Sequence, residues 1–597
     1  MAKAVSFLSS TAMPVQWIDT SHYITAIGCN LAIASIQNPT EYEFLEGHSQ
    51  IITTFALNKS RNICVSGQCG KESHEESSVP AIVWDLTSRS QLLLLRGHKS
   101  KITHIAVSDD GRMVAISDEF TRNIWIWDIQ ERDLACILQS PESVSSLAFS
   151  DQRTDEWYLH VVSNIKIVEF KIIFDPRTFE YRNESKFYAN PTTGYKRTSD
   201  SIFCSSDYLF VGTHLGELSI YNTTSATIRA SIPVDNFSIS CISANDSGNT
   251  VIVCGRNISI VQGEDKKWNL IKQIDIGKPI ISISVLNSIA LLRTVDTGIY
   301  LFDTKRYSHE ILLRGTTHAP LTFSISSNTI AVALGENGLT LLNIEDGKLL
   351  FDSYHFKIKA TSISNTPLND FIIGCNDGTL LQINNIGKVQ WTTERVHRGK
   401  ITSLCVTNDF IASGGDDGMI RIITHKSRSI VNELLVHNGP VFQIIPSFGY
   451  PQRIISVSQD KTVTTTDVSN GKRIYQELTS MRILFTSIAQ FKDGENEILV
   501  AKGDGKVVAY DWPKEGIIFQ TESPQKLQIN SIDLRPNSRV LACGGESEYI
   551  SFVDFNNNMR WKLSDPAHST PVRCVKWTKS GKYLVSAADD GICLWCV

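Results

Sequence analysis

Short apolar stretches, each ending in an acidic or small polar residue, recur about every 40–45 positions along the chain. The clearest are Ile82–Asp85 (IVWD) and Ile124–Asp128 (IWIWD). Within these stretches apolar and polar residues alternate, as they do along a half-buried β-strand, and no segment has a sustained helical period. A period of this length, with Gly-His near the start of each repeat and Trp-Asp near its end, is typical of the four-stranded blades of a β-propeller.

Projected along the chain, the period predicts fourteen blades, and we therefore expect an all-β fold of two tandem seven-bladed propellers. One interval, from Glu169 to Asn222, is longer than the others because a polar segment is inserted at 171–200. Asp-Gly pairs such as Asp377-Gly378 suit the tight turns between strands. The third strands of the blades are predicted to end near Gln37, Asp85, Asp128, Glu169, Asn222, Gln262, Asp303, Asn343, Asn384, Thr424, Asp467, Asp511, Asp554 and Cys596.

The boundary between the two rings depends on which strand closes each ring, because an open ring would leave an unpaired sheet edge. We expect Ala4–Leu8 (AVSFL) to be the outer strand of the blade that ends at Asp303, and Glu310–Leu313 to be the outer strand of the last blade. This scheme gives one propeller at 1–305 and the other at 306–597. In the alternative scheme the N-terminal strand closes the C-terminal ring, and the chain passes between the rings twice.

The strong repeats share a His, a Ser, an Asp and a Trp, a combination that could suggest a catalytic relay. Such sets recur in several repeats, however, whereas one active site needs a single set. Buried polar groups need hydrogen-bond partners, and a His–Ser–Trp chain between adjacent strands would supply them. We therefore assign a structural role inside the blades to His48, Trp84, Asp85, His98, Ser117, Trp127, Asp128, His397, Ser413, His437, Ser456, Asp460, His568, Ser586 and Trp595.

Composition narrows the classes of partner. The 57 basic and 62 acidic residues give a net charge of −5, which provides no overall field to attract nucleic acid or an anionic membrane. No apolar stretch is long enough for a transmembrane helix, and the N-terminus lacks the apolar core of a signal peptide. We therefore expect a soluble intracellular protein that binds neither nucleic acid nor a membrane.

Motifs for catalysis, metals or cofactors are not found. The 13 cysteines fit buried, reduced thiols, and in the single CxxC motif the i, i+3 spacing of Cys593 and Cys596 places their side chains on opposite faces of a strand. Ser413–Gly415 and Cys543–Gly545 lack the lysine and the following helix of a phosphate-binding loop. With no HExxH or GxSxG either, we expect no enzyme activity and no cofactor.

Two polar insertions interrupt the period, and loops of this kind often carry binding residues. The first, Gln68–Pro80 (QCGKESHEESSVP), contains Lys71 and His74. It is either a solvated excursion of a hairpin or a contact for a protein partner. Its His and Glu side chains are too loosely placed to preorganise a metal site.

The second insertion, Lys171–Asp200, interleaves basic and aromatic residues, a combination suited to an acidic protein surface or, less so, to single-stranded nucleic acid. Alternatively, the segment is a long hairpin whose aromatic rings pack on its own propeller. A weaker departure from the period surrounds Lys266, Lys267 and Lys272. The candidate partner-binding residues in the second insertion are Lys171, Arg177, Tyr181, Arg182, Lys186, Tyr188, Tyr195, Lys196 and Arg197.

The order of strong and weak repeats resembles the WD40-repeat family, and within it the double-propeller WD-repeat proteins of cilia and flagella. Many repeats lack the tryptophan, and Thr424 and Cys596 stand where that family usually has Asp. The matching runs cover nearly the whole chain. They are AIGCNLAIASIQ and FLEGH, then IVWDL, TGYKR leading into FVGTHLGELSIYN, VHRGKITSLCV with SGGDDGMIRI, VHNGPVFQI, and SAADDGICLW at the C-terminal end.

The resemblance implies a non-enzymatic structural protein of the axonemal cytoskeleton. It implies a position on the luminal side of doublet microtubules near the inner junction of the B-tubule, with tubulin and other microtubule inner proteins as partners. The basic segment at 171–200 would suit the acidic surface of tubulin. Two other function classes stay open: a soluble adaptor that reads peptides or binds cytoskeletal filaments, and an enzyme built in a propeller channel.

Overall fold

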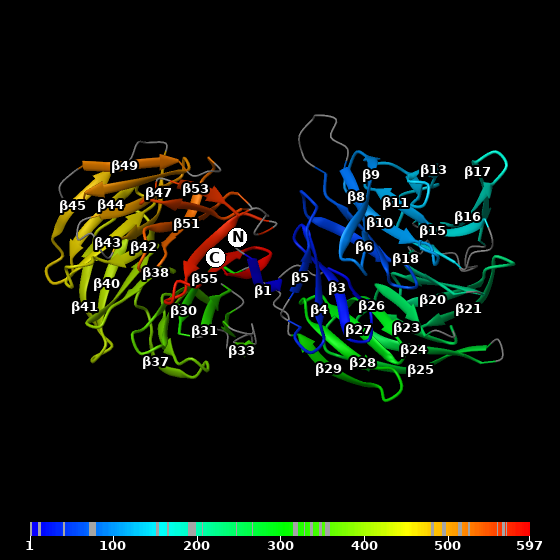
Figure 1. The fold of residues 1–597 in the computed structure, drawn as a ribbon. Helices are drawn as coiled ribbons and strands as arrows, with labels where there is room; N and C mark the ends of the chain where they lie inside the picture. Colours follow the sequence, from blue (N-terminus) through cyan, green and yellow to red (C-terminus); the bar gives the residue numbers. More distant parts are fainter. Residues whose placement is uncertain are drawn as a thin grey trace. The chain divides into compact units, whose positions relative to one another are not determined.

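In a computed structural model of the chain, the residues that it describes form β-strands and the turns between them (Figure 1). Among the residues that it describes, no helix is long and apolar enough to cross a membrane. It describes residues 3–596 except 10–12, 40–41, 71–78, 151–154, 164–165, 189–198, 206, 246–247, 265–266, 314–319, 328, 335–337, 345–348, 353–358, 479–482, 492–496, 512–515, 523–525, 548, 558, 564–567 and 569.

The described strands form fourteen four-stranded antiparallel sheets, and the prediction of an all-β fold built from four-stranded repeats is confirmed. The chain divides into two compact units: a middle unit, Thr11–Thr317, and a terminal unit that combines Met1–Ser10 with His318–Val597. In most sheets the second and third strands are buried on both faces, whereas the fourth strand alternates between exposed and half-buried residues. The fourth strand therefore forms the outer edge of each sheet.

The middle unit contains seven sheets, each made of four consecutive strands. From the second sheet to the seventh, the first strands of successive sheets contact one another. Strand β3 of the first sheet contacts β6 of the second, and β26 of the seventh sheet contacts β2 of the first, which closes the ring. The strands are β2 Val15–Trp17, β3 His22–Ile27, β4 Asn30–Ser35 and β5 Tyr42–Leu45; β6 Ile52–Leu57, β7 Ile63–Gln68, β8 Val79–Asp85 and β9 Ser90–His98; β10 Ile102–Val107, β11 Met113–Asp118, β12 Asn123–Asp128 and β13 Asp133–Gln139; β14 Ser146–Phe149, β15 Glu156–Ser163, β16 Lys166–Asp175 and β17 Glu180–Phe187; β18 Ser199–Cys204, β19 Tyr208–Thr213, β20 Glu217–Asn222 and β21 Thr227–Pro233; β22 Cys241–Ala244, β23 Thr250–Cys254, β24 Asn257–Glu264 and β25 Lys267–Asp275; β26 Ile280–Leu286, β27 Ile289–Thr294, β28 Ile299–Asp303 and β29 Ser308–Leu313.

The terminal unit also contains seven sheets in a closed cycle, in which β30 of its first sheet contacts β54 of its last. One core cluster spans this closure and joins Phe323 to Val585 and Leu594. The strands are β30 Thr322–Ser326, β31 Thr329–Ala333, β32 Leu339–Asn343 and β33 Leu349–Asp352; β34 Ala360–Asn365, β35 Phe371–Cys375, β36 Leu380–Ile383 and β37 Val389–Thr393; β38 Ile401–Val406, β39 Phe410–Gly415, β40 Met419–Thr424 and β41 Ile430–Leu435; β42 Val441–Pro446, β43 Arg453–Ser458, β44 Thr462–Asp467 and β45 Arg473–Leu478; β46 Phe485–Gln490, β47 Glu497–Lys502, β48 Lys506–Asp511 and β49 Gly516–Glu522; β50 Ile529–Leu534, β51 Val540–Gly545, β52 Ser551–Asp554 and β53 Met559–Lys562; β54 Val572–Trp577, β55 Tyr583–Ala588, β56 Gly591–Cys596 and β1 Lys3–Ser9.

The expected scheme of ring closure is wrong, and the alternative scheme holds. Strand β1 pairs antiparallel with β56, from Lys3 opposite Cys596 to Ser9 opposite Gly591, and lies beside the C-terminal strands (Figure 1). Strand β29, which includes Glu310–Leu313, instead pairs with β28 and completes the seventh sheet of the middle unit. The chain thus starts in the terminal unit, builds the middle unit and returns, so the boundaries differ from those expected at 305.

The predicted ends of the third strands agree closely with the structure. Ten of the fourteen coincide with the last residue of a third strand, and β4, β24 and β36 end within two residues of the prediction. The fourth difference is larger: β16 continues past Glu169 to Asp175, because the insertion lengthens both β16 and β17 into one paired hairpin. The ten coinciding ends are Asp85, Asp128, Asn222, Asp303, Asn343, Thr424, Asp467, Asp511, Asp554 and Cys596.

Candidate functional site

The most complete polar set lies in the last sheet of the terminal unit. His568 precedes β54, Ser586 lies on β55, and Asp590 lies in the turn before β56. The Trp595 indole donates to Ser586 Oγ at 2.8 Å, and Ser586 Oγ lies 2.7 Å from His568 Nε2. His568 Nδ1 lies 2.6 Å from the Asp590 carboxylate. Because all four side chains are buried, the chain of hydrogen bonds satisfies polar groups that water cannot reach.

Two further sheets carry variants of this set. His48 Nε2 lies 2.6 Å from Ser66 Oγ, which also accepts the Trp84 indole N–H at 2.8 Å. Here Gln68 replaces the aspartate, with its Oε1 2.8 Å from His48 Nδ1. In the other sheet, His437 Nε2 lies 2.8 Å from Ser456 Oγ, and its Nδ1 lies 3.1 Å from Asp460.

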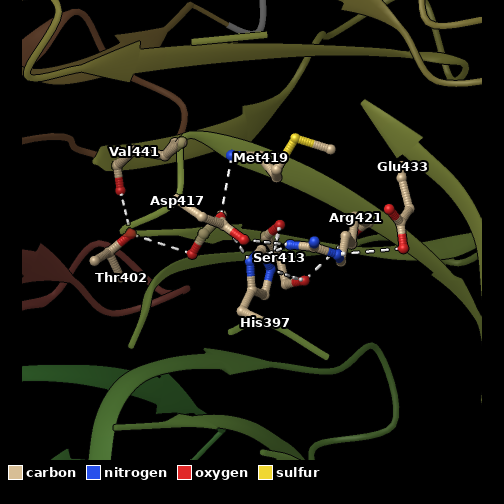
Figure 2. Close-up of polar contacts among 9 residues, drawn as sticks. His397, Thr402, Ser413, Asp417, Met419, Arg421, Glu433 and Val441 are labelled. Atoms are coloured by element: carbon tan, nitrogen blue, oxygen red, sulfur yellow. Dashed lines mark hydrogen bonds and ion pairs between the residues drawn. The ribbon is translucent and has the colours of Figure 1, made fainter. Parts of the chain in front are cut away.

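The set around His397 uses an arginine where the tryptophan is missing (Figure 2). His397 Nε2 lies 2.9 Å from Ser413 Oγ, and its Nδ1 lies 3.0 Å from Asp417 Oδ1. Arg421 donates to Asp417 at 2.7 Å and also lies 3.6 Å from Glu433. The arginine, on the third strand, therefore ties the turn that precedes this strand to the fourth strand of the sheet.

His98 does not form the expected chain with Ser117 and Trp127. Ser117 lies opposite Ile124, one position further along β11 than the residue that would face the tryptophans, so its hydroxyl points to the other face of the sheet. There it lies 3.2 Å from Thr103 Oγ1 and 3.3 Å from His104 Nδ1. Neither ring nitrogen of the buried His98 has a hydrogen-bond partner, and its ring instead meets Trp125 edge-on.

The aspartates at the ends of third strands hold the turns that follow. Asp85 accepts the backbone N–H of Thr87 at 2.8 Å and the hydroxyl of Ser88 at 2.8 Å. Asp128 is buried and pairs with Arg112 at 2.8 Å, and it also accepts a hydrogen bond from Tyr181. These contacts account for the aspartates as structural groups.

The part of the second insertion that the structure describes is a long hairpin of β16 and β17, which packs partly on its own unit. The Tyr188 hydroxyl donates to Glu169 at 2.9 Å, and the ring is buried. Tyr181 reaches Asp128 of the preceding sheet, and Arg112 lies 5.2 Å from the centres of the rings of Trp157 and Phe174. Phe174, Tyr181 and Tyr188 therefore serve as packing for the hairpin, whereas Phe179 and Phe187 are exposed.

Most described basic residues of the hairpin also have partners within the unit. Lys171 pairs with Glu156 at 2.8 Å, Lys186 donates to the Thr224 carbonyl at 2.7 Å, and Arg182 lies 3.8 Å from Asp175. Arg177 lies in the exposed turn beside Phe179, which is 75% exposed. The remaining candidates, Tyr195, Lys196 and Arg197, with Lys71 and His74 of the first insertion, lie outside the described residues.

The titration of the buried groups indicates structural roles. Burial lowers the pKa of His48 to about 4 and that of His98 to about 4, so both rings are neutral at pH 7. Burial opposes ionisation of Asp417, but hydrogen bonds from Arg421 and His397 outweigh it and lower the pKa of that carboxyl. Among the described residues no three His, Cys, Asp or Glu side chains are placed to hold a metal ion.

Hydroxyl groups that join neighbouring sheets were not predicted from the sequence. Thr402 Oγ1 donates to the carbonyl of Val441, the first residue of the next sheet, at 2.6 Å (Figure 2). The same bond recurs from Thr53 to Ile102 at 2.5 Å, from Ser240 to Ile280 at 2.5 Å and from Thr361 to Ile401 at 2.7 Å. A Ser or Thr at the same phase of several repeats is the signal that would have identified them.

Comparison with known proteins agrees with this repeated architecture. Residues 89–128, 388–424 and 559–596 match the WD40 model (WD domain, G-beta repeat). The chain is 22% identical to the human protein named cilia- and flagella-associated protein 52, and 22% identical to the Chlamydomonas reinhardtii protein of that name. Both similarities cover 96% of this chain and 93% of the relative. The mouse WD repeat-containing protein 90 is 20% identical over 97% of this chain, which covers 33% of that protein.

Proposed function

This chain carries WD40 repeats and is similar along almost its whole length to cilia- and flagella-associated proteins. We propose that it is a non-enzymatic scaffold of the ciliary or flagellar axoneme. We further propose that it is a microtubule inner protein. In this role it binds tubulin on the luminal side of doublet microtubules, near the inner junction of the B-tubule, and stabilises them during motility.

The observation that carries this proposal is the extent of the similarity. A generic propeller repeat would align with parts of many WD40 proteins, whereas this similarity runs through both units and covers 93% of the relatives from human and alga. The polar side chains support a scaffold as well, because His568, Ser586 and Trp595 bind one another rather than face a cavity.

Contacts within the unit support one place in the second insertion for the proposed contact with tubulin. Lys171, Lys186 and Tyr188 are engaged inside their own unit, so the acidic partner surface that we propose would meet the turn of the hairpin. Arg177 supplies a positive charge there and Phe179 an exposed ring. Aromatic and arginine side chains together are typical anchors of protein interfaces.

Fractionation of cilia tests the proposal. The tagged protein should remain with axonemes after detergent and high-salt extraction, and should become sensitive to protease only when the doublet wall is opened. A wholly soluble pool would refute the scaffold role, and recovery with short peptides or actin but without tubulin would support the adaptor instead.

A pair of variants tests the contact separately. The double substitution Arg177→Glu and Phe179→Ser should lower retention at least tenfold, whereas Arg132→Glu, in the matching turn of the preceding sheet, should not. Full retention of the double variant would exclude the hairpin turn as the contact and leave the axonemal role standing.

A further inference from the structure

Two cysteines face each other across neighbouring strands of the sixth sheet of the middle unit. Cys241 begins β22 and Cys254 ends β23, and the two are direct partners in the antiparallel register. Among the register pairs of the described strands, this is the one that joins two cysteines. Both are free thiols.

Their separation suits a covalent link. Directly opposed residues on antiparallel strands have Cα atoms about 4.5–5.5 Å apart, within the range of about 4.4–6.8 Å that a disulfide spans. Their side chains are also joined by a hydrogen bond. Burial raises the pKa of the Cys254 thiol, and the hydrogen bond with Cys241 raises it further. The register and the side-chain contact therefore place the two thiols within reach of a disulfide.

The two thiols differ in access. Cys254 is fully buried in a core cluster with Ile258 and Ile280, whereas Cys241 is half-buried beside the exposed Ser240. The Ser240 hydroxyl lies 3.8 Å from Cys241 Sγ. A small polar oxidant can thus reach Cys241 but not Cys254.

We propose that Cys241 and Cys254 are a redox-active dithiol, which hydrogen peroxide converts into a cross-strand disulfide. The Cys241 thiolate attacks peroxide, an S–O bond forms as the O–O bond breaks, and hydroxide leaves. The Cys254 thiol then attacks the Cys241 sulfenic sulfur, and water leaves with the thiol proton. Peroxide is reduced by two electrons, which the two thiols supply.

The disulfide would restrain the backbone where the sixth sheet contacts the seventh. Ser240, the residue before Cys241, donates its hydroxyl to the Ile280 carbonyl of the seventh sheet at 2.5 Å. A link from Cys241 to β23 would restrain the same backbone segment. Oxidation is therefore expected to slow amide exchange at the start of β22, and a reductant should reverse the effect.

Peptide mapping of the full chain tests the proposal. After treatment with hydrogen peroxide, mass spectrometry without reduction should find a Cys241–Cys254 linked peptide, and free thiols should fall by two from the 13 in the chain. Dithiothreitol should restore both. Peroxide that oxidises other cysteines, or takes Cys241 to the sulfinic acid, without forming this link would overturn the proposal.

A variant and an internal control complete the test. In Cys254→Ser no thiol is present at position 254 to convert the Cys241 sulfenic acid into a disulfide. Labelling of Cys241 by dimedone should therefore rise at least tenfold over the wild type. Equal labelling would contradict the proposal. Cys593 and Cys596 lie three positions apart on β56 and should stay unlinked under the same conditions. If the variant does not fold, the mapping of the wild type alone decides.

Discussion

At the scale of the residue, the same position in different sheets has different energetic roles. His568 is bonded at both ring nitrogens, to Ser586 and to Asp590. His98 is equally buried but has no hydrogen-bond partner. Burying a polar group without a partner costs about 1–3 kcal/mol, so His568 stabilises its sheet while His98 weakens its own.

We therefore predict opposite effects of replacing the two rings by leucine. His568→Leu should destabilise the terminal unit by about 2–4 kcal/mol, because buried Ser586 and Asp590 each lose a hydrogen bond. His98→Leu should be neutral or stabilising by about 1 kcal/mol at pH 7. Urea denaturation, with hydrogen exchange to follow each unit, measures both.

The pH dependence gives a second measurement for His98. Its pKa is lowered to about 4 in the folded protein by burial, whereas an unfolded histidine has a pKa of about 6.5. The unfolded state therefore binds more protons between these values, and stability falls as the pH falls from about 6.5 to 4. His98→Leu should remove about 2 kcal/mol of this loss at pH 5. An unchanged pH profile would contradict the assignment.

At the scale of the element, seven of the turns after third strands share one backbone conformation with different residues. In these seven, the residue four positions after the end of the strand has φ between 53° and 69°, in the left-handed region that favours glycine. Only one of the seven is glycine. The residues are Arg89, Arg132, Phe179, Ala226, Tyr307, Arg428 and Gly471.

This pattern predicts that Arg132→Gly stabilises the protein slightly. The left-handed conformation costs an L-residue about 1–2 kcal/mol, and glycine avoids this cost. Glycine also raises the conformational entropy of the unfolded state, which destabilises the folded state by about 0.5–1 kcal/mol. The free energy of unfolding should therefore rise by about 0.5 kcal/mol. The matched control, Gly471→Ala, should cost about 1 kcal/mol by the same reasoning. Thermal and urea unfolding measure the two changes, and a loss in both would contradict the prediction.

The element scale also shows what the sequence could predict. Asp85, Asp467 and Asp554 mark strand ends because an acidic residue and a turn recur together. Ser117 is buried in its sheet but bonds to Thr103 and His104 in place of His98 and Trp127, because a shift of one residue reverses the face of a strand, and composition does not reveal such a shift. The hydrogen bond from Tyr181 to Asp128 could not be predicted from the sequence. It joins residues of two different sheets, and the spacing between these two residues is not part of the repeat pattern.

At the scale of the whole molecule, each unit is a cycle of seven sheets, and the terminal unit takes its last strand from the other end of the chain. No periodicity could decide this, because Ala4–Leu8 and Glu310–Leu313 are both plausible outer strands. Both closures satisfy the rule against open edges. The choice depends on pairing between residues almost 600 positions apart, which a local pattern does not contain.

The observed closure predicts the effect of deleting residues 2–10. Strand β56 would become an edge, so its amides should exchange faster and the terminal unit should lose stability. The middle unit should be unaffected, because β29 already covers β28. Hydrogen–deuterium exchange by mass spectrometry resolves both regions. Faster exchange in β28 with β56 unchanged would instead support the closure first expected.

The position of β1 also has a consequence for synthesis on the ribosome. Its partner β56 is translated only after all the other strands of both units, so β1 must stay unpaired while the middle unit folds. Domains that emerge early can fold as units during translation, but the terminal unit cannot close until β56 emerges. During that interval β1 and the incomplete terminal unit expose unpaired strand edges, and chaperones that shield such edges should affect the yield of this unit more than that of the middle one.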